Sequence, residues 1–69
     1  MELTTIRADL TAREAWNLAQ FIKRLRFDQC YELTDSGYSR RDREAQAYEM
    51  LAAIDKVGRA LKDAGYAPR

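Results

Sequence analysis

The apolar residues of this chain recur every three or four positions in two stretches, and one run of turn-forming residues separates the stretches. Residues 34–37 read Thr-Asp-Ser-Gly, and each of these residue types favours a reversal of the chain. Two amphipathic helices on either side of a turn pack as an antiparallel hairpin. The pattern therefore predicts an all-α fold of two long helices, in a single domain over residues 1–69.

The predicted first helix spans residues 11–33 and begins with a capping box. Thr11 and Glu14 stand three positions apart, as the Ser/Thr and Glu of that motif do. The helical period falters near residue 27. Either the helix runs on through this point, or it breaks and Asp28 caps a short middle helix. The stripe that should face the core contains Ala15, Leu18, Ile22 and Leu25.

The predicted last helix spans residues 39–65 and follows a linker over residues 34–38. Ser39 is a suitable N-cap, with an acidic residue three positions later. At the other end Gly65 stands where a left-handed cap residue is needed, and Tyr66 follows it. These signals predict a Schellman motif at the end of the helix.

The opening residues 1–10 alternate loosely between apolar and polar side chains. This pattern fits a short strand or an extended N-terminal arm. The rest of the chain offers no second strand. The segment would therefore pair with a strand across a dimer, or lie over a helix as an arm.

The composition excludes several classes of function. With no histidine and only Cys30 as a soft ligand, the common zinc and iron sites and the His-dependent catalytic arrangements are excluded. We therefore expect no enzyme activity, no metal and no cofactor. A lone cysteine forms no internal disulfide, and no signal peptide or membrane span is evident, so we expect a cytoplasmic protein.

The first helix carries aromatic rings away from its core stripe. On a helical wheel Trp16 and Phe27 fall on one face, roughly opposite that stripe, and Lys23 and Gln20 lie between them. Aromatic rings mixed with cationic and amide groups are typical of protein interfaces. The alternative is that the N-terminal arm, or a second copy of the chain in a dimer, covers these rings.

Two basic clusters, at residues 23–26 and 40–43, would lie close together in a hairpin. They favour phosphate binding and hence a nucleic-acid-associated regulator. The alternative is an ordinary solvated surface, because acidic residues interrupt or follow both clusters. The net charge of +1 is also much smaller than the excess of positive charge that is typical of nucleic-acid-binding proteins.

Three parts of the sequence stand out together: residues 10–16, the run Ala-Gln-Phe-Ile-Lys-Arg at 19–24 with Phe27 and Asp28, and the ending Ala-Gly-Tyr-Ala-Pro-Arg at 64–69. In these parts the chain resembles short helical proteins of bacteria, phages and plasmids. Proteins of this kind include anti-CRISPR inhibitors, which bind larger complexes and catalyse nothing. The resemblance implies no site residues.

The favoured hypothesis is a small protein-interaction module that binds and modulates a larger partner complex, with an anti-CRISPR-like inhibitor as its specific form. The alternatives are the nucleic-acid-associated regulator and a purely structural dimerisation module. At 8.0 kDa a single core is marginal, so a homodimer is also expected. The predicted partner-binding residues are Trp16, Gln20, Lys23, Arg24, Phe27, Arg40 and Arg41.

Overall fold

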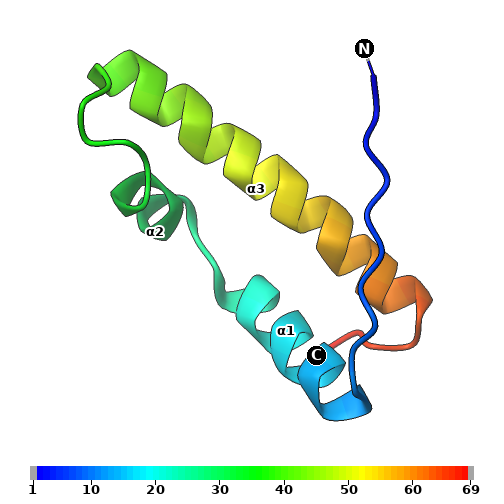
Figure 1. Cartoon of the computed structure of the whole chain (residues 1–69). Helices are drawn as coiled ribbons and strands as arrows, with labels where there is room; N and C mark the ends of the chain where they lie inside the picture. The colour runs from blue at the N-terminus through cyan, green and yellow to red at the C-terminus, as the bar shows by residue number, and fades with distance from the viewer. Residues whose placement is uncertain (1, 69) are drawn as a thin grey trace.

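The structure, a computed structural model, describes residues 2–68 and contains three helices. They are α1 (Ala12–Arg24), α2 (Phe27–Glu32) and α3 (Arg40–Asp63), and no strand forms within the described part of the chain. α1 and α2 follow one another along one side of α3, and each contacts it (Figure 1). The predicted all-α class is confirmed.

The predicted capping box forms at the start of α1. The backbone N–H of Thr11 donates to Glu14 Oε1 at 2.8 Å, and the backbone N–H of Glu14 donates to Thr11 Oγ1 at 3.1 Å. The two bonds satisfy N–H groups that have no partner within the helix. They fix α1 to begin at Ala12, one residue after the cap.

The first arm of the expected hairpin is two helices and not one long helix. Leu25 and Arg26 are extended, with ψ angles of 135° and 164°, and this separates α1 from α2. The backbone N–H of Arg26 donates to Gln29 Oε1 at 2.9 Å, so the Gln29 side chain provides an acceptor for this N–H group at the start of α2. The break is thus observed, but Asp28 lies inside α2 and does not cap it.

α3 begins and ends with the predicted caps. Ser39 Oγ accepts a hydrogen bond from the backbone N–H of Asp42 at 3.2 Å. At the other end Gly65 has a φ of 101°, and its N–H donates to the Lys62 carbonyl at 3.0 Å. The N–H of Tyr66 donates to the Leu61 carbonyl at 2.8 Å, which completes the Schellman motif.

α1 packs on the C-terminal half of α3 through small side chains. Ala15 and Ala19 are buried there against Leu61. A Cβ placed on Gly58 would lie 3.2 Å from Ile22 Cγ2, so glycine allows the two helices to approach closely. The larger apolar side chains packed around this cluster stay half-buried, and they are Leu18, Ile22, Val57 and Tyr66.

Arg43 fastens α2 and the following linker to the N-terminal half of α3. Its Nε donates to Thr34 Oγ1 at 2.8 Å, and its Nη2 donates to the Tyr31 carbonyl at 3.3 Å. The guanidinium also lies 4.4 Å from the centre of the Tyr31 ring. The linker covers residues 33–39 and is slightly longer than predicted, and Arg43 contacts it at Thr34.

The N-terminal residues 2–10 form an arm without helix or strand, which leaves the start of α1 as an extended trace (Figure 1). Leu3 is 84% exposed and Ile6 is 78% exposed. Of the two predicted forms, the arm is observed. Side chains that are this exposed do not cover the aromatic rings of α1.

Candidate partner-binding surface

The break after α1 separates the two rings that were predicted to share a face. Trp16 is 44% exposed and lies beside Tyr66, with 6.3 Å between the ring centres. Phe27 instead packs between α2 and α3, with its ring centre 4.8 Å from that of Tyr48 and 6.1 Å from that of Tyr31. Phe27 therefore belongs to the packing of α2 on α3.

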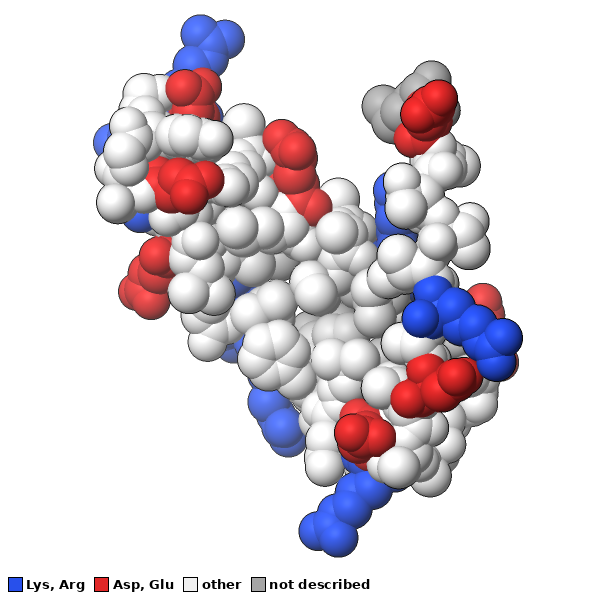
Figure 2. All heavy atoms as spheres, in the orientation of Figure 1, with Lys and Arg blue, Asp and Glu red and all other residues white. Residues whose placement is uncertain are grey.

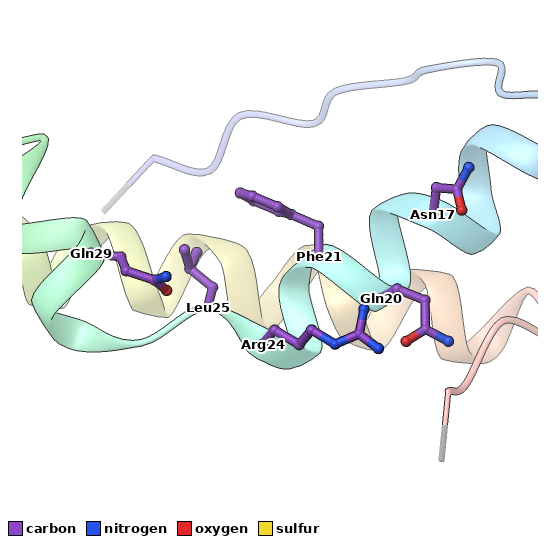
Figure 3. Close-up of a pocket in the computed structure, with 6 residues that line it drawn as sticks. All are labelled: Asn17, Gln20, Phe21, Arg24, Leu25 and Gln29. Atoms are coloured by element: carbon purple, nitrogen blue, oxygen red, sulfur yellow. The ribbon is translucent and has the colours of Figure 1, made fainter.

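A shallow groove of about 350 Å³ opens along α1 and the start of α2 (Figure 3). We call it the α1 groove. Two of the predicted partner-binding residues, Gln20 and Arg24, line it, whereas Trp16 and Lys23 lie elsewhere on α1. The full lining is Asn17, Gln20, Phe21, Arg24, Leu25 and Gln29.

The α1 groove combines an exposed aromatic ring with polar groups. Phe21 is 57% exposed, and in Figure 3 its ring extends along the helix in the direction of Leu25. The Arg24 guanidinium points towards Gln20 in the same view. Carboxamides can both donate and accept hydrogen bonds, and a guanidinium matches a carboxylate. This lining suits a polypeptide that presents an apolar side chain and a carboxylate.

Sequence reasoning missed Phe21 as a surface residue. Only the contacts of the folded chain show how far it protrudes. The spacing of Asn17, Phe21 and Arg24, at four and three residues, was the available signal that they share a helix edge.

Two other predicted residues line a second, acidic groove of about 560 Å³ between α2 and α3. Phe27 and Arg40 are part of it, together with three carboxylates. Arg40 Nε lies 3.3 Å from Glu44 Oε1, in an exposed ion pair. An excess of carboxylates repels a phosphate group, so this groove does not favour nucleic acid. The lining is Phe27, Asp28, Tyr31, Glu32, Arg40 and Glu44.

The two basic clusters do not form one patch, because α2 lies between the end of α1 and the start of α3. Ile22, next to the first cluster, packs near Gly58, which lies about 27 Å from Arg40 along α3 at about 1.5 Å per residue. Arg43 is bound to the linker, and Arg41 is exposed at the far end. On the face drawn in Figure 2 the basic side chains lie apart from one another, near the edge.

Among residues 2–68, no three His, Cys, Asp or Glu side chains lie close enough together to hold a metal ion. In that same part of the chain no helix has the length and apolar character needed to cross a membrane. The α1 groove, on the exposed side of a helix, is the candidate site.

Comparison with protein families gives one match. A model described as a family of unknown function, DUF7706, matches residues 1–69 of the chain. The chain belongs to this family. No curated protein and no solved structure matches the sequence of this DUF7706 member.

Proposed function

We propose that this DUF7706 chain is a small non-enzymatic protein-interaction module, which binds a larger partner complex through the α1 groove and modulates it. The observation that carries the proposal is the 57% exposure of Phe21 among carboxamides and a guanidinium. An aromatic ring costs free energy when it faces water, and interfaces are enriched in such rings. A partner side chain that covers Phe21 would remove that cost.

The charges beside the groove indicate the chemistry of the partner. Arg24 lines the groove, and Lys23 and Arg26 are exposed neighbours of it in the chain. The backbone carbonyls at the end of α1 favour these cations, so the basic end of the helix is electrostatically stable. A partner segment with an acidic residue next to an apolar one would pair with Arg24 and pack on Phe21.

The experiment compares the tagged chain with single variants in host lysate with and without nuclease, and identifies the captured proteins by mass spectrometry. We expect Phe21→Ala and Arg24→Glu to reduce capture of the partner at least tenfold, which corresponds to about 1.4 kcal/mol. Each variant has a matched control on another surface. Tyr38→Ala removes a ring that is 52% exposed in the linker, and Lys56→Glu makes the same change of charge on the exposed side of α3.

Equal losses in the test variants and in their controls would contradict the α1 groove as the binding surface. Capture that disappears on nuclease treatment would contradict a protein partner and favour the nucleic-acid-associated regulator. Circular dichroism of each variant checks that the helices remain folded.

The specific form of the proposal, an anti-CRISPR-like inhibitor, is supported by the resemblance of residues 10–16, 19–24, 27–28 and 64–69 to short helical phage and plasmid proteins. Its test is a plaque assay on cells with CRISPR immunity. Expression of the chain should restore infection by a targeted phage, and Phe21→Ala should abolish this effect. Unchanged immunity would contradict the inhibitor proposal. Binding through the α1 groove would still be tested by the capture experiment.

A further inference from the structure

Among residues 2–68, Tyr48 on α3 has the most exposed aromatic ring of the chain. Tyr48 is 65% exposed, and its ring centre lies 4.8 Å from that of Phe27 on α2. Arg40 and Glu44 precede Tyr48 at intervals of four residues, so the three side chains share one edge of α3. Phe27, Arg40 and Glu44 line the groove between α2 and α3, which we call the acidic groove. Tyr48 therefore stands at one end of this groove.

The acidic groove carries more negative charge than its own cation neutralises. Its lining has three carboxylates and one guanidinium, and that guanidinium, of Arg40, lies 3.3 Å from Glu44 in an ion pair. Asp28 and Glu32 are exposed, and neither belongs to an ion pair within residues 2–68. They stand four positions apart on α2, where like charges repel each other. A cation bound between these two carboxylates would relieve the repulsion.

The rings beside these carboxylates favour a guanidinium over an ammonium group. Phe27 and Tyr31 line the groove, with 6.1 Å between their ring centres. A planar guanidinium stacks on aromatic faces and pairs with a carboxylate through two hydrogen bonds, whereas an ammonium group is a compact and strongly hydrated charge. α2 already receives one guanidinium in this way, since that of Arg43 lies 4.4 Å from the centre of the Tyr31 ring.

The dimensions of the acidic groove suit a segment of polypeptide. Its volume of about 560 Å³ lies within the range of about 300–1,000 Å³ for ligand clefts. From Arg40 to Tyr48 the edge of α3 extends about 12 Å, at about 1.5 Å per residue. Side chains on the same face of an extended segment are about 7 Å apart, so two of them fit along this edge. Figure 2 shows acidic side chains over the end of the molecule that holds α2 and the start of α3.

We propose that the acidic groove, with the Tyr48 ring at its end, binds a basic segment of a partner polypeptide that contains arginine. One arginine pairs with Asp28 and Glu32, and a second packs on the exposed ring of Tyr48. The charge of this segment is opposite to that of the segment proposed for the α1 groove. The inference uses different residues and does not rest on the proposed function.

The test titrates the isotope-labelled full chain with a capped arginine hexapeptide and follows the backbone amide signals by nuclear magnetic resonance. We expect saturable shifts at Asp28, Glu32, Glu44 and Tyr48. Glu32→Gln removes one unpaired carboxylate and should weaken binding at least about fivefold. Its control, Glu2→Gln, removes the same charge from the exposed arm and should change the affinity by less than about twofold.

A second variant keeps every carboxylate and removes the ring. Tyr48→Ala should weaken binding at least about threefold, and Tyr38→Ala, which removes a ring that is 52% exposed in the linker, should not. The amide spectrum of each free variant checks that its helices are folded.

Three results would overturn the inference. The first is the absence of saturable shifts up to millimolar peptide. The second is an equal loss of affinity in the test variants and in their controls, because the peptide would then follow the total charge and not the groove. The third is a lysine hexapeptide that binds as tightly as the arginine peptide, since the rings would then contribute nothing to the choice of cation.

Discussion

Glu14 is held at the start of α1 by Thr11, and this makes the cap sensitive to pH. The hydrogen bond with the Thr11 backbone, followed by the one with the Thr11 side chain, lowers the pKa of Glu14 below its ordinary value of 4.5. A lowered pKa in the folded state stabilises the fold above the pKa of the unfolded state. This stabilisation is lost as the pH falls through the folded pKa.

Glu14→Gln is the matched variant, because glutamine still accepts the hydrogen bond from Thr11 but does not titrate. We expect the parent chain to unfold at a higher temperature than the variant at neutral pH. The difference should shrink as the pH falls through the folded pKa of Glu14. Thermal unfolding followed by circular dichroism measures it, and a difference that persists at low pH would show that the carboxylate charge is not its source.

Arg43 is a structural residue, although the sequence placed it in a basic cluster. Its guanidinium donates to Thr34 Oγ1 and to the Tyr31 carbonyl, and Thr34 is buried. Arg43→Ala should lower the free energy of unfolding by about 2 kcal/mol, because both acceptors lose a charged donor. Urea denaturation measures this loss. Arg41→Ala should stay within about 0.5 kcal/mol of the parent chain, and an equal effect of both variants would contradict the assignment.

At the scale of elements, Gly58 sets how closely α1 lies on α3. Gly58→Ala gains about 1 kcal/mol of helix propensity, but its new Cβ would lie 3.2 Å from Ile22 Cγ2. We expect the two effects nearly to cancel in the parent chain. In an Ile22→Ala background the contact is gone, so the same substitution should recover the full gain. Urea denaturation of the four proteins measures this, and equal effects of Gly58→Ala in both backgrounds would contradict the close contact.

The helix ends show how much of the fold the sequence could predict. Some residue types have strong preferences for helix cap positions, so the sequence predicts the caps formed by Thr11, Ser39 and Gly65. The start of α2 was not, because its first N–H belongs to Arg26 and is satisfied by the Gln29 side chain. Arginine has no preference for an N-cap, so nothing in the pattern decided between a break and a continuous helix.

The candidate surface was predicted only in part, and for the same reason. A helical wheel over residues 11–33 assumes one unbroken helix, and on that assumption Trp16 and Phe27 share a face. The two extended residues after α1 turn Phe27 towards Tyr48 on α3. Gln20 and Arg24 lie before the break, and the structure brings them together in the α1 groove.

At the scale of the whole molecule, α1 and α2 follow one another along one side of α3, and each contacts it. The α1 groove offers an aromatic ring, carboxamides and a guanidinium. This composition suits a different protein with an acidic segment.

Photo-cross-linking in living cells tests the central claim, which is that a partner binds at the α1 groove. A photoreactive phenylalanine analogue replaces Phe21 in one sample and Tyr38 in the other, since the two rings have similar exposure. We predict a covalent adduct with a different protein from position 21 and much less adduct from position 38. Equal yields from the two positions, or adducts with a second copy of the chain alone, would contradict the claim.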